Sequence, residues 1–586
     1  MNKKLLVVSL AMGSICLAGC SQPPIETSGS TPNTEASSIA SASSEEKPAD
    51  ITNADLPLGV TTYTAADGTT HNLNRSSVYK VSGVPHVNSR PEDGKKQKLL
   101  VNPIRFTKDG NDKRDTIVAD DALLEKINKT FTASDEELKR LSGSEIFSVQ
   151  SFYERSSFGK GAFDVVVLPC WVDYDGTPTQ FQNDCELARE GGGEHASNYL
   201  KSWYNTEYNK TGHGLLGADW QYTWKDFDSD EDGFIDLVWN VYAYPQTENS
   251  TEFWWAYVTY TGEDANINSP TVQTLAFAST NFMTSKFNGY DPHTFIHETG
   301  HTYGVIDYYD YNNVWKPMGG VDYMDHNLGD HCAFTKFLYG WVNPWVIKED
   351  MLKDGKVAEI TLRTITTSGD CLILASPNYN MTAFDEFMMV ELMGPHGLAE
   401  RDYKSGYENT KGFTEDGIRI THVDNRMWRG NHDQWISDPN DLGRNGGEVR
   451  NTNSHAGRNG MRTDLDFWPN EDGSAKQYFT QLSLMDSSNI EQNWTNTPNF
   501  TANNGTLFKR GQRFNLGAKS AWAKTFMPSG TNLWNKAKTI TGWASTDKQT
   551  FTIDETCTFN YYLKVKNIVK DPEYGAVATL EIKLDN

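Results

Sequence analysis

The segment from residue 297 to residue 307 constrains the fold more than any other part of the chain. It reads His-Glu-Thr-Gly-His-Thr-Tyr-Gly-Val-Ile-Asp. Residues four apart lie on one face of an α-helix, so His297 and His301 can direct their imidazoles at a common point. Gly304 can adopt backbone angles that end the helix and turn the chain. The segment therefore predicts a helix followed by a reversal that returns Asp307 to the two histidines.

These three side chains predict a zinc site. Two imidazoles and a carboxylate suit zinc, and three protein ligands leave a fourth position for water. Glu298 lies where its carboxylate can reach that water and act as general base, while zinc lowers the pKa of the water toward about 7. The hydroxide would attack a peptide carbonyl, and Glu298 would return the proton to the leaving amine. An ordinary helix can contain His-Glu-x-x-His by chance, but Gly304 and Asp307 weaken that alternative.

The extended motif resembles that of the metzincins, and with Asp307 as third ligand it resembles the immune inhibitor A family of bacterial metallopeptidases. Other stretches share the resemblance, from about residue 90 to near the C-terminus. They are SVQSFYERSSFGK, DSDEDGFIDLV, DYMDHNLGDHCAFTKFLYGW and GIRITHVD. The resemblance implies a metzincin-like domain and a zinc endopeptidase that cleaves extracellular proteins or peptides.

The same resemblance makes Met324 the methionine of the Met-turn beneath the zinc site, with Met318 as a second candidate. A plain core methionine is the alternative. Asp-His-Asn follows Met324, so the chain lacks the tyrosine that some metzincins place near the substrate. His326, His331 and Tyr323 are the candidates for stabilising the oxyanion.

A second cation site is predicted by the acidic run Asp-Phe-Asp-Ser-Asp-Glu-Asp-Gly-Phe-Ile-Asp at residues 226–236. Its carboxylates alternate before a turn-forming glycine, and hard oxygen ligands at this spacing suit calcium. The expected ligands are Asp228, Asp230, Asp232 and Asp236. The position of the bidentate glutamate of an EF-hand is not acidic here, so a complete EF-hand is not expected. The alternative is an acidic turn without an ion, in which like charges repel.

The N-terminus predicts export and a lipid anchor. Residues 1–20 have a basic start, an apolar run too short to remain as a spanning helix, and the ending Leu-Ala-Gly-Cys. This ending resembles the bacterial lipoprotein box, in which Cys20 receives the lipid; an ordinary signal peptide is the alternative. Residues 21–55 are rich in Ser, Thr and Pro and predict a flexible tether. We expect an extracellular protein, or one anchored by acyl chains to the outer face of a bacterial membrane.

Hydrophobic patterning divides the rest of the chain at about residue 347. Residues 56–347 mix strand-like runs such as KLLVNPIRF and FDVVVLP with helical runs such as DDALLEKINKTF and SEIFSVQSFYERSSF, which predicts an α+β catalytic domain. Residues 348–586 contain short alternating runs: EITLRTI, FMMVELM, IRITHVD, FTIDE and AVATLEIKL. These predict a β-rich, β-sandwich-like C-terminal region.

Length, net charge and cysteine content bear on the number of domains, the partners and the disulfides. A chain of 586 residues exceeds what one core usually serves, which agrees with two folded domains. A formal net charge of -24 disfavours nucleic acid as a partner and tolerates divalent cations. Cys170 and Cys185 flank a polar loop and are the expected pair if a disulfide forms, which sequence alone does not establish.

Two other functions are compatible with the zinc motif. One is a surface binding or adhesion protein with a structural metal site, and the other is a zinc hydrolase of a non-peptide substrate. Glu298 disfavours the first, because a structural site has no use for an unliganded base. His422 and Asp424 could bind a metal, but a place at the domain interface is the favoured interpretation.

Overall fold

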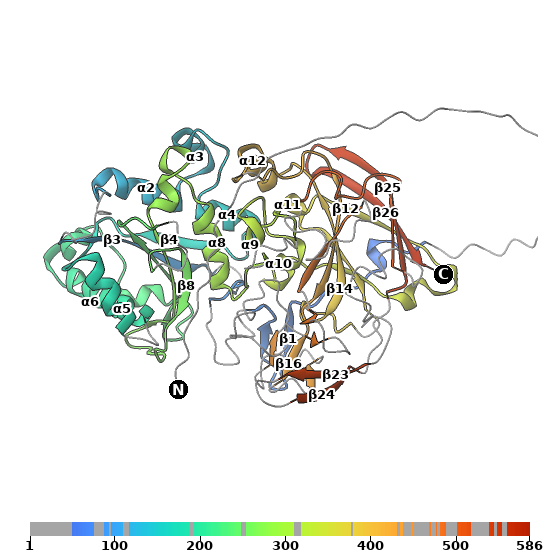
Figure 1. Cartoon of the computed structure of the whole chain (residues 1–586), viewed down its shortest axis with the longest axis horizontal. Coiled ribbons are helices and arrows are strands. Elements are labelled where there is room, and N and C mark those ends of the chain that lie inside the picture. Colours follow the sequence, from blue (N-terminus) through green and yellow to red (C-terminus); the bar gives the residue numbers. More distant parts are fainter. Residues whose placement is uncertain are drawn as a thin grey trace, which may run out of the picture.

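The computed structural model of the chain has a mixed α/β fold with several sheets (Figure 1). The residues that the structure describes are 50–75, 87–92, 95–108, 117–187, 192–247, 253–309, 318–376, 379–408, 410–429, 434–436, 447–449, 468–469, 476–477, 481–487, 501–516, 538–543, 548–553 and 559–585. The predicted signal segment with Cys20 lies outside these residues, as does most of the predicted tether. Within them, no helix has the length and apolar character needed to cross a membrane.

The first half of the chain is built around one sheet with the strand order β4-β3-β7-β10-β8, and β5 also pairs with β3. Its strands are β3 (Gln97–Phe106), β4 (Phe163–Val167), β5 (Val172–Tyr174), β7 (Leu237–Tyr242), β8 (Tyr257–Tyr260) and β10 (Thr274–Ser279). All pairs are parallel except that β8 runs antiparallel to β10. The predicted strands KLLVNPIRF and FDVVVLP are confirmed as β3 and β4.

Both faces of this sheet are buried. On β7, Leu237 and Trp239 belong to one apolar cluster, whereas Val238 and Tyr242 belong to another. Successive side chains of a strand point to opposite faces, so the two clusters lie on opposite sides of the sheet. This explains why its central strands are continuous apolar runs in the sequence.

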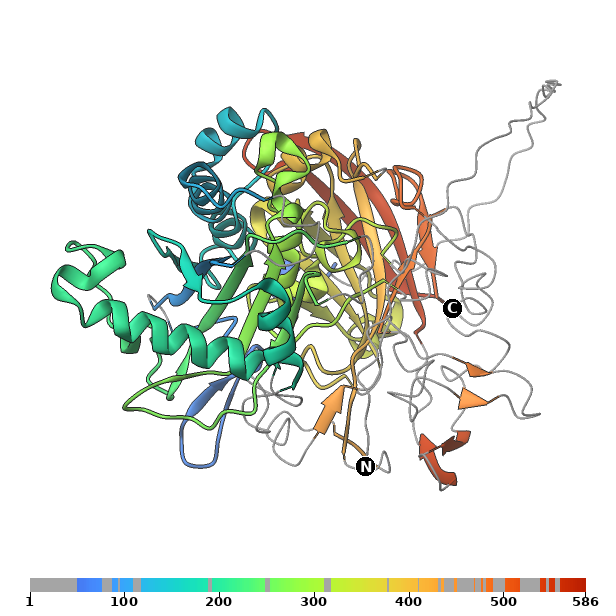
Figure 2. The same ribbon diagram turned by 60° about the vertical axis from the view of Figure 1, so that its left-hand side comes forward.

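Seven described α-helices lie between residues 121 and 302, and different helices cover the two faces of the sheet. They are α2 (Asp121–Thr132), α3 (Asp135–Ser142), α4 (Val149–Ser156), α5 (Pro178–Leu187), α6 (Gly192–Tyr208), α7 (Asn281–Thr284) and α8 (His293–Thr302). Helices α2, α4 and α8 pack on the cluster that contains Trp239, and α5 and α6 pack on the other. Figures 1 and 2 show α5 and α6 far from the C-terminal sheets. The predicted helical runs are confirmed as α2 and α4, and Asp120 caps α2 by accepting the N–H of Leu123.

Short elements connect these parts. In the first half they are η1 (Asn53–Asp55), β1 (Thr62–Thr64), β2 (Thr70–Asn72), η2 (Thr211–Leu216), η3 (Trp224–Phe227), β6 (Phe234–Ile235), β9 (Thr271–Val272) and η4 (Phe287–Gly289). After α8 come α9 (Tyr323–His326), α10 (Ala333–Leu338), η5 (Glu349–Gly355), α11 (Ile365–Ser368) and α12 (Leu398–Ser405).

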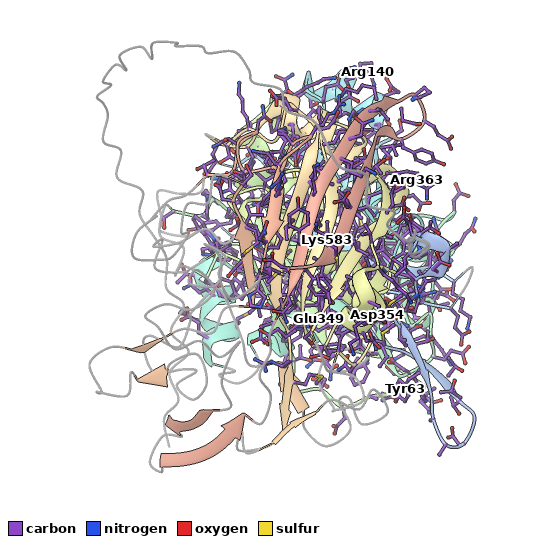
Figure 3. The ribbon with its side chains drawn as sticks, turned by 90° about the vertical axis from the view of Figure 1, so that its right-hand side faces the viewer. Tyr63, Arg140, Glu349, Asp354, Arg363 and Lys583 are labelled. Atoms are coloured by element: carbon purple, nitrogen blue, oxygen red, sulfur yellow. The ribbon has the colours of Figure 1, made fainter. Side chains whose placement is uncertain are left out.

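Two sheets form the C-terminal half. The inner sheet contains β11 (Trp345–Ile347), β13 (Cys371–Ala375), β14 (Glu386–Met393), β15 (Gly417–Asp424) and β21 (Leu482–Met485), in that order. The outer sheet has the order β12 (Ala358–Arg363), β26 (Gly575–Leu584), β25 (Tyr561–Asp571) and β22 (Arg513–Asn515). Figure 3 shows β25 and β26 facing the viewer, with Arg363 and Lys583 labelled on that side.

The remaining described strands are short. They are β16 (Met427–Arg429), β17 (Gln434–Ile436), β18 (Gly447–Val449), β19 (Trp468–Pro469), β20 (Lys476–Gln477), β23 (Lys538–Trp543) and β24 (Lys548–Ile553). The five C-terminal runs predicted as strands are confirmed, because the described residues of each overlap β12, β14, β15, β24 or β26.

The inner sheet is buried on both faces, like the sheet of the first half. Met388 and Val390 of β14 belong to the cluster shared with the outer sheet, whereas Phe387 and Met389 belong to the cluster that also contains Trp239. The inner sheet therefore packs directly against the first half of the chain.

The folded part begins before residue 56. The Ile51 N–H donates to the carbonyl of Val357, and the Glu359 N–H donates to the carbonyl of Ile51. Leu56 is buried in the cluster between the two C-terminal sheets. Residues 51–55, which the sequence assigned to the end of the tether, thus pack with the C-terminal half.

Cys170 and Cys185, the expected pair if a disulfide forms, are both free thiols. Cys185 is buried in α5, and Cys170 packs against the same apolar cluster. Burial raises the pKa of each thiol to about 12. A buried free cysteine packs as a small apolar side chain. The polar sequence between the two cysteines does not show that both pack in this way.

Candidate metal centre

Helix α8 is tied to the sheet and to the helix beside it. The Trp239 indole N–H of β7 donates to the Thr299 hydroxyl at 3.0 Å, and the Tyr153 hydroxyl of α4 donates to the carbonyl of Ile296 at 2.7 Å. Both partners lie on the buried part of α8. The predicted helix around residue 297 is therefore confirmed, and it is held on two sides.

The three predicted ligands converge. The Nε2 atoms of His297 and His301 lie 3.0 Å apart. After the helix, Gly304 has a φ of 83°, a left-handed value that favours glycine and turns the chain back. One carboxylate oxygen of Asp307 then lies 2.9 Å from His297 Nε2 and 3.2 Å from His301 Nε2. The helix and reversal predicted from the sequence produce this cluster.

Backbone carbonyls fix both imidazoles. His297 Nδ1 lies 2.7 Å from the carbonyl oxygen of Tyr323, and His301 Nδ1 lies 2.9 Å from that of Val305. A carbonyl oxygen can only accept a hydrogen bond, so each Nδ1 must donate. In a neutral imidazole this leaves the Nε2 lone pair for a cation. Two such nitrogens and one carboxylate oxygen fit a zinc ion.

The charges of the cluster are strongly coupled. Burial alone would lower the pKa of His301, but the Asp307 carboxylate raises it to about 9. Burial alone would raise the pKa of Asp307, yet the two neighbouring imidazoles hold it well below its ordinary value. Coupled and buried groups of this kind are concentrated at functional sites.

Glu298 lies beside the ligand group without belonging to it. Its side chain is 8% exposed, and burial raises its pKa, with the neighbouring imidazoles opposing that rise. A carboxylate with a raised pKa is suited to accept a proton and give it back.

Met324 lies beneath α8. A Cβ atom added to Gly300 would be 2.7 Å from the Met324 sulfur, so the helix and the sulfur can approach only because residue 300 has no side chain. The Tyr308 N–H donates to the carbonyl of Met324 at 2.7 Å, which joins Met324 to the residue after Asp307. The second candidate, Met318, is buried in the same cluster.

Two of the three oxyanion candidates are enclosed by protein. His331 is 1% exposed and lies among aromatic rings, with burial lowering its pKa well below the ordinary value. Tyr323 is 2% exposed. His326 Nε2 lies 3.6 Å from a carboxylate oxygen of Glu408.

Two tyrosines that the sequence did not single out lie beside the ligands. The Tyr260 hydroxyl of β8 donates to the carbonyl of His301 at 3.2 Å, and Tyr260 is 41% exposed. The ring of Tyr309 lies 6.3 Å from that of His297. Tyr309 follows the third ligand by two residues, so its place was foreseeable, whereas nothing in the sequence connects β8 with α8.

A cavity of about 450 Å³ opens beside the first turn of α8. Its lining is mostly polar and includes Lys286, Thr294, Tyr407 and Glu408. Thr294 precedes Glu298 by four residues, so the two side chains lie on the same face of the helix. The cavity therefore adjoins the helix face that bears the candidate general base.

The acidic loop brings three of its four predicted ligands together. Carboxylate oxygens of Asp228, Asp230 and Asp236 lie within 4.8 Å of one another, with Asp230 exposed and the other two buried. Burial raises the pKa of Asp228 and raises that of Asp236 to about 7. Asp232 is not in this group, and one of its oxygens accepts the N–H of Phe234.

His422 and Asp424 make polar contacts at the inner sheet, one across two strands and one with a residue that follows β15. His422 Nε2 lies 3.1 Å from a carboxylate oxygen of Glu386, and Asp424 binds the Arg426 guanidinium through both oxygens at 2.8 Å. Neither residue belongs to a group of potential metal ligands among the described residues. The contact with Glu386 accounts for His422, and the ion pair with Arg426 accounts for Asp424.

Comparison with known proteins does not place the chain in a family. No family model matches it, and no curated protein matches it. The functional assignment therefore depends on the geometry of the site.

Proposed function

We propose that the protein is a zinc-dependent endopeptidase that hydrolyses peptide bonds of extracellular proteins or peptides. The observation that carries the proposal is the convergence of His297, His301 and Asp307 with Glu298 beside them. A structural metal site needs no buried, unliganded carboxylate, whereas metal-assisted hydrolysis needs a base there. Glu298 thus favours an enzyme over a surface binding protein with a structural metal.

In the proposed reaction, side chains of the protein hold the metal and carry the proton. A bound zinc would supply a Lewis acid that polarises the substrate carbonyl and lowers the pKa of water. His297 and His301 present Nε2 atoms whose direction is set by hydrogen bonds at Nδ1. Glu298 takes a proton on its carboxylate from the attacking water and returns it to the leaving amine.

Two features favour an extended peptide over a small non-peptide substrate. Strand β8 is the last described strand of its sheet, and Tyr260 connects it to α8. An extended peptide that pairs with such an edge would pass beside the ligands. A side chain next to the scissile bond would then enter the polar cavity beside Thr294.

We further infer a metzincin-like catalytic domain of the immune inhibitor A type and a β-sandwich-like C-terminal region. The antiparallel strand β8, the ligand helix α8 and the place of Met324 beneath that helix support the first inference, with Met324 as the Met-turn residue. The apolar cluster shared by the two C-terminal sheets supports the second. Export and anchoring through Cys20 stay predictions from the sequence.

We also propose that Asp228, Asp230 and Asp236 bind calcium. Three oxygens converge, two of them on buried carboxylates, and like charges this close repel unless a cation neutralises them. An ion here would stabilise the loop before β7 without taking part in hydrolysis.

The direct test is Glu298→Ala in the purified full chain. We expect it to bind zinc like the wild type and to lose casein hydrolysis by about 10²- to 10⁴-fold, because only the proton carrier is removed. Zinc content and casein hydrolysis are measured on the same sample, with Glu154→Gln on α4 as a control that keeps both properties. Hydrolysis by the Glu298 variant at the wild-type rate would contradict the proposal.

A further inference from the structure

Residues 321–333 run beneath α8 and determine how the first ligand is presented. The carbonyl of Tyr323 accepts the hydrogen bond from His297 Nδ1, and the Met324 sulfur packs under Gly300. The orientation of His297 therefore depends on where this segment lies, although no residue of the segment belongs to the converging ligand group.

One buried ion pair from the inner C-terminal sheet holds both ends of the segment. Arg419 Nη1 donates to the carbonyl of Val321 at 2.8 Å, and Arg419 Nε donates to a carboxylate oxygen of Glu391 at 2.7 Å. The other oxygen of Glu391 accepts the N–H of Ala333 at 3.0 Å. The first and last residues of the segment are thus bound to the same pair.

The pair is built into the sheet on the side that faces the metal centre. Glu391 of β14 and Arg419 of β15 are directly opposite each other in the antiparallel ladder. Each is 1% exposed. Because side chains alternate along β14, Glu391 shares the face of Phe387 and Met389, which pack on the cluster of the first half.

A third contact acts on the middle of the segment. One oxygen of Asp402 on α12 accepts the N–H of Gly329, and the other lies 2.8 Å from His293 Nε2 at the start of α8. Asp402 thus joins the segment to the ligand helix itself.

Stability alone does not explain such a pair. Taking two charges out of water is costly, and a protein in which apolar residues of similar volume replace a buried ion pair is often as stable or more stable. What apolar residues cannot do is donate to the carbonyl of Val321 and accept from the N–H of Ala333. These two hydrogen bonds fix the position of the segment.

We propose that Arg419 and Glu391 are positioning residues of the metal centre: they fix residues 321–333 and, through the carbonyl of Tyr323, the orientation of His297. The proposal deepens the zinc endopeptidase function and depends on it. On this proposal, the inner C-terminal sheet helps to orient a metal ligand and is not only packed against the first half of the chain.

The test is the double variant Arg419→Met/Glu391→Leu in the full chain. Both charges of the pair leave together, so neither partner stays buried alone and the fold is expected to persist. Without metal, we expect faster hydrogen exchange of the backbone amides of residues 321–333, measured by mass spectrometry. In competition with a chromophoric chelator, we expect zinc affinity to fall about tenfold, the lower end of effects seen when a ligand's hydrogen-bond support is lost.

A second arginine–carboxylate pair, in which the arginine side chain is 38% exposed, serves as the control. Arg363 binds Asp370 through two hydrogen bonds of 2.7 and 2.8 Å, and Arg363 lies on the side of the outer sheet in Figure 3. Arg363→Met/Asp370→Leu should leave the exchange of residues 321–333 and zinc affinity unchanged. Leu580→Ala, a cavity in the core between the sheets, should lower stability without a selective change in that segment.

The outcomes separate this proposal from the proposed function. Wild-type exchange and wild-type zinc affinity in the double variant would overturn the positioning role. Faster exchange of residues 321–333 in a chain whose wild type binds no zinc would support the hold on the segment and refute the zinc site. If the double variant does not fold, Arg419→Lys, which keeps the charge and loses the forked geometry, must weaken zinc binding, or the proposal fails.

Discussion

The histidine cluster of α8 and the acidic loop before β7 were both predicted from short motifs, yet they are supported in different ways. In the acidic loop, Asp228 accepts the N–H groups of Asp232 and Gly233, and Asp236 accepts from the backbone and hydroxyl of Ser229. From outside the loop, the N–H of Lys98 on β3 donates to Asp236, and the N–H groups of Asn266 and Thr271 donate to the carbonyl of Gly233.

The histidine cluster depends on distant parts of the chain. His297 is oriented by the carbonyl of Tyr323, whose segment is held by Arg419 and Glu391 of the inner C-terminal sheet. The two buried carboxylates of the loop are thus held mostly by groups of the loop itself, whereas the orientation of His297 depends on residues of the C-terminal half. Changes far from the cluster should therefore affect it, and changes in the loop should act locally.

Removing a ligand should have the largest effect. His301→Ala takes away one of the two Nε2 atoms, so we expect zinc affinity to fall by more than about 100-fold, beyond the loss of a ligand's supporting hydrogen bond. Casein hydrolysis should fall below detection. His71→Ala in β2 is the control, and equal zinc affinity in both variants would remove His301 from the ligand set.

Breaking the contact of α12 with α8 should lower the free energy of unfolding by about 3 kcal/mol, because the buried charge of His293 would lose one of its two carboxylate partners. The variant is Asp402→Asn, measured by urea unfolding near neutral pH. Arg401, the preceding residue, lies nearer the surface, and Arg401→Gln should cost less. An Asp402 variant as stable as the wild type would show that α8 does not depend on α12.

The same contact predicts a pH dependence. Burial alone would lower the pKa of His293, but the carboxylates of Asp402 and Asp291 raise it from 6.5 to about 10. Because the pKa is higher in the folded chain, the stabilisation is complete below about pH 6.5 and is lost as the pH rises toward about 10. His293→Gln should flatten the fall of stability over this range, and an unchanged slope would exclude His293 as its cause.

Gly300→Ala should cost about 1 to 2 kcal/mol of the free energy of unfolding, because the new Cβ would lie 2.7 Å from the Met324 sulfur. The double variant with Met324→Ala should show a smaller loss than the sum of the two single variants. Gly262→Ala, where a Cβ meets no atom within 4 Å, is the control. Since alanine favours helices, a stabilised Gly300 variant would show that sulfur and helix are not in close contact.

The acidic loop should give the smallest effect. Excess calcium should raise the melting temperature of the wild type by a few degrees, because the ion binds the folded chain only. Asp230→Asn should reduce this shift without changing zinc affinity, and Asp350→Asn, an exposed acid on η5, should not reduce it. No shift in the wild type after thorough chelation would mean that the loop holds no calcium.

Much of the metal centre and many of the strands could be predicted from the sequence, because they depend on residues close together in the chain. The spacing of His297 and His301, the turn at Gly304 and the return of Asp307 follow from helix geometry and from the backbone freedom of glycine. Strands β3 and β4 and five strands of the C-terminal half followed from apolar runs and alternation. The packing of Ile51 against β12 did not follow, because it joins residues more than three hundred positions apart.

The support of the site could not be predicted for the same reason. Arg419 and Glu391 are two charged residues within apolar strands, and nothing in the sequence says which carbonyl or N–H they reach. Cys170 and Cys185 were the expected pair if a disulfide formed; in the fold both are free thiols that pack on one apolar cluster.

The measurement that tests the central claim most directly is casein hydrolysis by the purified full chain before chelation, after removal of zinc, and after zinc is added back. Hydrolysis should stop when zinc is removed and return when about one zinc per chain is restored, since there is one cluster of two histidines and an aspartate in the described residues. Hydrolysis that continues without zinc, or a zinc-loaded chain that cleaves no peptide bond, would contradict the account.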